Sequence, residues 1–261
     1  MTRPRLLAAL ILGALLAPDV ATTQDLKSLL QSSRESVVLI RCFDGLGRET
    51  GSGTGFLVQS GVVATNEHVV DGARRVEVQY FDKETTAALG VLAADEGNDL
   101  ALLAVPARDL PPVILAQPGT IEAGDRILVL GNPMGLAGTI SDGIVAAIRP
   151  DGLGGDDGFF ERTPLLQITA PISPGSSGSP VLGASGEVIG VAVGQYVYGQ
   201  NLNFAIPTAS LVALMARMQP GALERTYAGP TRFGGWGLVR NLAISIVFFG
   251  LLVVALRRAR G

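Results

Sequence analysis

The sequence has one cysteine and one histidine among its 261 residues, and this scarcity removes several classes of protein. Cys42 has no partner for a disulfide within the chain. One cysteine and one histidine are too few ligands for a common zinc site, so we expect no metal and no cofactor. Cys42 lies in a strand-like run, which predicts a buried structural thiol rather than a reactive one.

Charged and aromatic residues are also few, at 16% and 5% of the chain. Because there is no basic run or arginine stripe, the sequence does not indicate a nucleic-acid partner. Glycine is abundant, with 34 residues, and short β-branched runs outnumber helical patterns. This combination is typical of an all-β protein built as a barrel.

The stretch from Pro174 to Pro180 has the pattern Gly-x-Ser-Gly-x-Pro and holds Ser177 between two glycines. Glycine allows a tight turn that presents the serine hydroxyl, and it lets nearby N–H groups point at a ligand. An exposed nucleophile and donors for an oxyanion are what acyl transfer requires. Taken alone, the pattern fits a surface turn equally well.

Two further residues, together with Ser177, could form a catalytic triad. His68, the one histidine, follows a strand-like run, and Asp99 opens an apolar run that predicts a half-buried strand end. A single histidine is more often structural, and many aspartates only cap a turn. The order His68, Asp99, Ser177 is the order of the triad in chymotrypsin-fold serine proteases.

The chain resembles the bacterial HtrA/DegP-like branch of these trypsin-like proteases and the related glutamyl endopeptidases. Five segments carry the resemblance, in the family's order, over roughly residues 35–215. They are Thr-Asn-Glu-His-Val at 65–69, Asp-Leu-Ala-Leu-Leu at 99–103, Gly-Asn-Pro-Met-Gly-Leu at 131–136, Gln-Ile-Thr-Ala at 167–170 and Asn-Phe-Ala-Ile-Pro at 203–207.

The resemblance implies a role for each residue of the motif. Ser177 would be the nucleophile, His68 the general base and Asp99 the group that orients the imidazole. The N–H groups of Gly175 and Ser177 would form the oxyanion hole. The expected reaction is hydrolysis of peptide bonds in extracytoplasmic proteins through an acyl-enzyme intermediate.

The nucleophile motif departs from the family pattern at two positions. Ser176 replaces the usual Asn, and Ser179 replaces the second Gly, as it does in glutamyl endopeptidases. Digestive relatives have an Asp before the nucleophile that pairs with a new N-terminus after cleavage. Because Ser176 stands there, we expect no zymogen switch of that type.

Substrate preference is expected to depend on Pro171, Ala192 and Val193. Pro171 occupies the pocket-base position of the digestive relatives and cannot pair with a basic side chain. Ala192 lies in the strand where glutamyl endopeptidases carry a histidine. Neither a basic nor an acidic P1 residue is supported, so we predict a small or medium apolar P1.

The predicted fold is a chymotrypsin-like double six-stranded β-barrel within a protease domain at 35–218. The barrels span about 35–115 and 120–207, and a glycine-rich hairpin loop at 45–53 is more plausible than a phosphate cradle. A closing helix is expected at 210–218. Predicted strands are 36–43, 53–59, 61–65, 76–81, 87–94 and 100–105 in the first barrel, and 126–130, 139–148, 165–169, 180–182, 188–193 and 203–206 in the second.

The segments outside the protease domain resemble a secretion signal and a membrane anchor. Residues 1–21 have the layout of a signal peptide, with an uncleaved anchor as the competing interpretation. A helical segment at 22–34, a linker at 219–237, a transmembrane helix at 238–256 and a cytoplasmic tail at 257–261 are expected. With these segments we expect a single-pass protein in a bacterial membrane, with its protease domain in the periplasm and without PDZ domains.

Two other functions stay open on the sequence. One is a membrane-anchored, non-catalytic or resting protease-like binding module, and the other is an esterase that uses the same triad. Expected partners are protein or peptide substrates and the membrane, and the family resemblance also allows a homo-oligomer.

Overall fold

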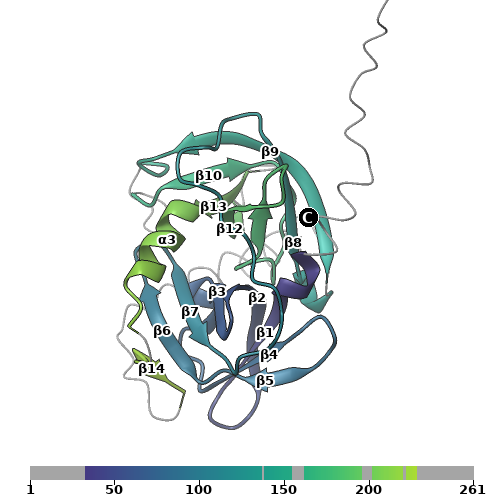
Figure 1. Ribbon diagram of the computed structural model, residues 1–261, viewed down its shortest axis with the longest axis vertical. Helices are drawn as coiled ribbons and strands as arrows, with labels where there is room; N and C mark the ends of the chain where they lie inside the picture. Colours follow the sequence, from purple (N-terminus) through teal and green to yellow (C-terminus); the bar gives the residue numbers. More distant parts are fainter. Residues whose placement is uncertain (1–32, 137, 155–161, 196–201, 220–221, 228–261) are drawn as a thin grey trace, which may run out of the picture.

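The computed structural model describes residues 33–136, 138–154, 162–195, 202–219 and 222–227. Two β-structures lie one above the other in Figure 1, with the first half of the chain below and the second half above. The fold is therefore all-β and chymotrypsin-like, as predicted.

The first half forms an open eight-stranded antiparallel sheet in the order β14-β6-β7-β3-β2-β1-β4-β5. A closed six-stranded barrel was the prediction, and it is wrong for this half. The end strands β5 and β14 each pair with one neighbour, so the ladder does not close. The strands are β1 Val37–Phe43, β2 Glu49–Gln59, β3 Val62–Thr65, β4 Arg75–Gln79, β5 Thr85–Ala87, β6 Gly90–Asp95, β7 Leu100–Ala104 and β14 Arg225–Thr226.

The second half is the closed six-stranded barrel that the sequence predicts, in the order β10-β13-β12-β11-β8-β9. Its strands are β8 Arg126–Gly131, β9 Thr139–Arg149, β10 Leu165–Ile168, β11 Pro180–Leu182, β12 Val188–Gln195 and β13 Asn203–Pro207. Each strand lies within two residues of its predicted bounds. The apolar runs are short, and the turns on both sides limit where each strand can begin and end.

One hydrophobic cluster joins the two halves. It combines Phe56 and Leu102 of the sheet with Leu130 and Phe204 of the barrel, all nearly inaccessible to solvent. Helix α3, Thr208–Ala216, lies at the junction in Figure 1 and buries Leu211 and Leu214 against the same cluster. Burial of this apolar surface fixes how the two halves sit relative to each other.

Two local predictions gain detail from the structure. The glycine-rich stretch at 45–53 belongs to the predicted hairpin, with a shorter loop, because β2 already begins at Glu49. Asp44 closes the turn of this hairpin: its Oδ1 accepts the N–H groups of Leu46 and Arg48 at 2.8 and 2.9 Å. The predicted linker also contains structure, because β14 returns to pair with β6.

Cys42 is buried, with 3% of its surface exposed, as the sequence predicts. Its Sγ lies 3.0 Å from the Val69 carbonyl oxygen, and burial raises the pKa of the thiol to about 12. A thiol held in its neutral form is a poor nucleophile, which agrees with a structural role.

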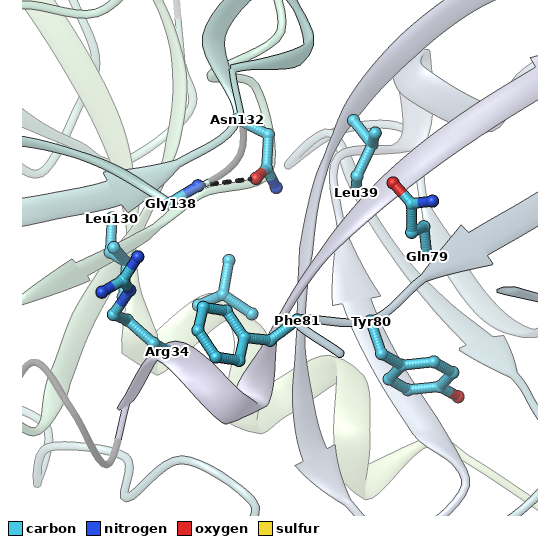
Figure 2. A pocket seen from close by; sticks show the side chains of 9 residues that line it. Arg34, Leu39, Gln79, Tyr80, Phe81, Leu130, Asn132 and Gly138 are labelled. Carbon is cyan, nitrogen blue, oxygen red and sulfur yellow. Dashed lines mark hydrogen bonds between the residues drawn. The ribbon is translucent and has the colours of Figure 1, made fainter. Parts of the chain in front are cut away.

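Figure 2 shows a pocket between the sheet and the barrel, walled by Leu39, Phe81 and Asn132 with Arg34 at its edge. The Arg34 guanidinium lies 4.9 Å from the Phe81 ring centroid. None of the predicted catalytic residues lines this pocket.

The predicted signal peptide, the transmembrane helix, the tail and most of the segment at 22–34 lie outside the described residues. Within the described ranges no helix has the length and apolarity to cross a membrane. Nor do His, Cys, Asp and Glu side chains gather there in groups of three that could hold a metal ion.

Candidate active site

His68 and Asp99 form a direct pair beside the N-terminal end of β7. His68 lies in α2, Glu67–Val70, and Asp99 directly precedes β7. The His68 Nδ1 is 2.5 Å from Asp99 Oδ2, and the His68 backbone N–H donates to Asp99 Oδ1 at 2.8 Å. With Nδ1 occupied, the other ring nitrogen, Nε2, is the one that can exchange a proton with a substrate or nucleophile.

Asp99 is more buried than the sequence predicts. Only 1% of its side chain is exposed, against 19% for His68. A buried carboxylate needs hydrogen-bond donors, and the His68 backbone and ring supply them. The Asn66 amide adds a bond to the Asp99 carbonyl oxygen at 2.9 Å, so the backbone of this residue is also held.

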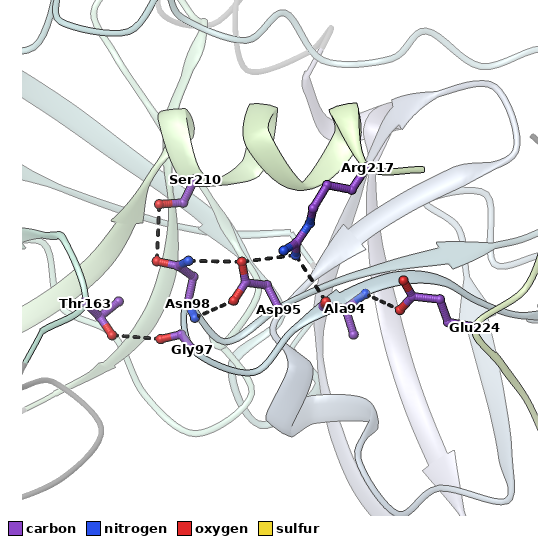
Figure 3. A network of polar contacts seen from close by, with 8 residues as sticks. All are labelled: Ala94, Asp95, Gly97, Asn98, Thr163, Ser210, Arg217 and Glu224. Atoms are coloured by element: carbon purple, nitrogen blue, oxygen red, sulfur yellow. Dashed lines mark hydrogen bonds and ion pairs between the residues drawn. The ribbon is translucent and has the colours of Figure 1, made fainter. Parts of the chain in front are cut away.

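The turn that presents Asp99 is built from side-chain bonds, shown in Figure 3. Asp95 accepts the backbone N–H and the side-chain amide of Asn98, both at 3.0 Å, and Arg217 pairs with the same carboxylate at 3.1 Å. Thr163 donates to the Gly97 carbonyl oxygen at 2.8 Å. These contacts allow Asp99 to keep a left-handed backbone, with φ of 50°, which is uncommon for a residue with a side chain.

Ser177 lies in a tight turn of the barrel half. The Ser176 N–H donates to the Ser173 carbonyl oxygen at 2.8 Å, which closes a turn over Pro174 and Gly175. Proline followed by a glycine with φ of +92° is the signature of a type II turn. Ser177 is half-buried, and its hydroxyl donates to the Val193 carbonyl oxygen at 3.4 Å.

The orientation of the Pro174–Gly175 peptide decides whether the Gly175 N–H is available. The Pro174 carbonyl oxygen accepts the N–H of Met134, in the short helix η1 Pro133–Gly135, at 2.9 Å. In a trans peptide the carbonyl and the N–H point in opposite directions. The Gly175 N–H therefore points away from η1.

Glycines let the turn that carries Ser177 approach the sheet closely. A Cβ on Gly53 would lie 2.6 Å from Val69 Cγ1, beside His68, and 3.2 Å from the Ser177 carbonyl oxygen. Gly178, with φ of +84°, faces the Thr54 carbonyl oxygen and the Thr65 hydroxyl with no space for a side chain. The turn carrying Ser177 thus packs directly onto the strands that lead to His68.

The three predicted specificity residues lie at different depths. The Val193 carbonyl is beside the Ser177 hydroxyl, while the Ala192 methyl group is fully buried in the barrel core. Pro171 is exposed, and its carbonyl oxygen accepts the Ser141 hydroxyl at 2.7 Å. Of these three residues, Val193 is the one that hydrogen-bonds to the Ser177 side chain.

Ser179, the second departure from the family pattern, is fully buried, and its hydroxyl has no partner in the part of the chain that the structure describes. The prediction from sequence also did not single out Thr54, Asn66 or Asn132 as site residues. All three are buried polar residues inside or next to apolar runs, a pattern that could have flagged them.

Comparison with known proteins gives a consistent result. The family described as "Trypsin-like peptidase domain" matches residues 53–191, just over half of the chain. HhoB of Synechocystis sp., named as a serine protease, is 37% identical over 70% of this chain and 44% of its own length. A Hahella chejuensis protein named "Probable periplasmic serine endoprotease DegP-like" is 34% identical over 68% of this chain and 38% of its own. The chain thus spans less than half the length of these relatives.

Among solved structures, the Rv3671c protease of M. tuberculosis in its active form superposes with a TM-score of 0.68 and 26% identity. The match covers 77% of this chain and 88% of that one. The inactive form of the same protease gives a TM-score of 0.63 with 29% identity, over 74% and 93% of the two chains.

Proposed function

Because the chain belongs to the trypsin-like peptidase family, we propose that it is a serine endopeptidase whose catalytic residues are Ser177, His68 and Asp99. The observation that supports this most is the His68–Asp99 pair, in which both carboxylate oxygens accept N–H groups of one histidine. A histidine that only fills a core does not require a buried carboxylate on both its backbone and its ring.

The proposed chemistry is that of a Ser-His-Asp triad, in which the Ser177 hydroxyl turns from the Val193 carbonyl oxygen toward His68. Ser177 Oγ attacks the carbonyl carbon of the scissile peptide while His68 Nε2 accepts its proton. The tetrahedral intermediate collapses to an acyl-enzyme, and His68 returns the proton to the leaving amine. Asp99 keeps the proton on Nδ1 and stabilises the imidazolium that forms, and water then repeats the sequence to release the acid.

The N–H groups of Gly175 and Ser177 are proposed as the oxyanion hole. Neither amide has an acceptor among the described residues, and the Gly175 N–H points away from η1. A hole of this kind contributes about 2.7–4 kcal/mol per donor to the transition state.

The residues beside Ser177 and the segments outside the barrels bear on the substrate and on the location of the protein. Of the three predicted specificity residues, Val193 lies beside Ser177 and provides no charged group, which favours a small or medium apolar P1 residue. Relatives named as periplasmic support a protease domain at 35–218 outside the cytoplasm. We propose that residues 1–21 are a cleaved or anchoring signal segment and that residues 238–256 span the membrane. The proposed substrates are proteins or peptides, and the family also allows a homo-oligomer.

The test compares hydrolysis of casein, p-nitrophenyl esters and peptides that differ only at P1. Wild type should cleave casein and prefer Val or Ala at P1, and Ser177→Ala and His68→Ala should lower kcat by up to about 10⁶-fold. Faster cleavage after Arg or Glu would contradict the apolar pocket. Turnover of esters without casein would indicate an esterase, and no turnover by a folded protein would favour the binding module.

A further inference from the structure

Thr54 connects the strands that lead to His68 with the turn that carries Ser177. It lies in β2 and is completely buried. Its backbone N–H donates to the Ser177 carbonyl oxygen at 2.8 Å. Its own carbonyl oxygen accepts the hydroxyl of Thr65, three residues before His68, at 2.7 Å. One residue of the sheet therefore bonds to both sides of the candidate site.

The Thr54 side chain makes a second pair of bonds. Its hydroxyl donates to the Gly175 carbonyl oxygen at 2.8 Å and accepts the Asn132 backbone N–H at 3.0 Å. A hydroxyl carries one proton, and a backbone N–H can only donate. The direction of both bonds is therefore fixed, and the proton lies toward Gly175.

Gly175 is held on both of its peptide planes by these contacts. The Met134 N–H fixes the preceding peptide through the Pro174 carbonyl oxygen, and the Thr54 hydroxyl fixes the following peptide through the Gly175 carbonyl oxygen. Glycine has little preference of its own among backbone conformations, so outside contacts must select one. Rotation of the second plane would leave a carbonyl and an N–H unsatisfied in a buried site.

We propose that Thr54 is a positioning residue for catalysis: it holds the Gly175–Ser176 peptide through its hydroxyl and the Ser177 carbonyl oxygen through its backbone N–H, and so fixes how the Gly175 and Ser177 N–H groups are placed relative to each other. This inference rests on the proposed function, because it assigns those two N–H groups to the oxyanion hole. Thr54 does not touch substrate. Its effect should therefore appear in the transition state and leave substrate binding nearly unchanged.

The test replaces Thr54 with valine, which keeps the shape and removes the hydroxyl. We expect kcat to fall by about 10- to 100-fold with KM changed by less than about twofold, because the hole loses alignment rather than a donor. Thr54→Ser retains the hydroxyl and should recover most of the activity. Thr54→Ala provides the same loss of hydroxyl if the valine variant does not fold.

Thr208→Val is the matched control. Thr208 is equally buried and donates to the Val188 carbonyl oxygen at 2.7 Å, away from the nucleophile turn. Both valine variants should lose stability, but only Thr54→Val should lose kcat. Binding of a peptide aldehyde, which places an oxyanion in the hole, should weaken in step with kcat. Unchanged kcat in Thr54→Val, or an equal loss in Thr208→Val, would overturn the proposal.

A readout without turnover separates this inference from the proposed function. In ¹⁵N-glycine spectra the Gly175 amide should give one signal in wild type and Thr54→Ser, and a shifted or split signal in Thr54→Val. An unchanged signal would overturn the role of Thr54 even in a protein that cleaves nothing. Absence of turnover in wild type, with the signal shifted as expected, would contradict the proposed function alone.

Discussion

Asp99 is the residue on whose charge the proposed chemistry depends most. In Asp99→Asn one carboxylate oxygen becomes an NH₂ group, which cannot accept the proton on His68 Nδ1, so the imidazole takes the wrong tautomer. We expect kcat to fall by about 10⁴-fold while the fold persists. Steady-state kinetics with circular dichroism would measure this, and the exposed Asp109→Asn is the control. Activity within tenfold of wild type would contradict the assigned role.

Cys42 links stability to pH. Its pKa is about 12 in the folded protein against an ordinary value of 9.0, so unfolding at alkaline pH releases a proton from the thiol. The free energy of unfolding should therefore be unaffected below pH 9 and fall between pH 9 and 12, by up to about 1.4 kcal/mol per pH unit.

Denaturant unfolding of wild type and Cys42→Ala between pH 7 and 10.5 measures this contribution. The difference between the two proteins should be constant up to about pH 9 and then narrow as wild type loses stability faster. Parallel curves over the whole range would show that the thiol titrates alike in the folded and unfolded states.

Single residues also show where prediction from sequence ended. The order of His68, Asp99 and Ser177, together with the family motifs around them, was enough to propose a triad. Thr54 could not be assigned, since its hydroxyl acts on Gly175, which is far away in the sequence. Contacts of this kind depend on how the two halves pack, which no local pattern encodes.

The loop between β6 and β7 positions Asp99 through its own side-chain bonds. Asp95→Ala removes the acceptor of two Asn98 N–H groups and the partner of Arg217. We expect a loss of about 1–2 kcal/mol in stability, together with a several-fold fall in kcat as the Asp99 turn loosens.

The control for this loop is Glu49→Ala, which removes an exposed ion pair with Arg41 at the far turn of the sheet. An exposed pair of this kind contributes about 0–1 kcal/mol, so its loss should leave kcat unchanged. Thermal unfolding would measure the stability of both variants, and steady-state kinetics would measure their kcat. An Asp95→Ala protein with normal kcat would mean that the loop does not position Asp99.

Among the elements, strands were predicted more accurately than their closure. β11 has its predicted bounds, and the apolar run at 100–105 gives β7, which is buried throughout. The sheet that fails to close could not be foreseen, because closure depends on whether β5 meets another edge. β14 was missed because two residues among prolines and glycines carry no strand pattern.

For the molecule as a whole, the segment at 222–227 packs against the sheet, because β14 pairs with β6. The Arg225 guanidinium lies 3.0 Å from Glu67 Oε1 and 3.7 Å from Asp71 Oδ1, both in or beside α2. Arg225→Ala should lower the free energy of unfolding by about 1–2 kcal/mol, because a bond to a nearly buried carboxylate is lost. Exposed Arg126→Ala should stay within about 0.5 kcal/mol of wild type. Equal unfolding midpoints for the two variants would contradict this account.

The most direct test of the central claim is labelling of the purified protein with a fluorophosphonate probe, beside Ser177→Ala. The probe forms a phosphonyl ester only with a serine that is activated by its base and faced by oxyanion donors. We predict rapid labelling of wild type and none of Ser177→Ala. A folded wild type that stays unlabelled would contradict an active triad at Ser177, His68 and Asp99.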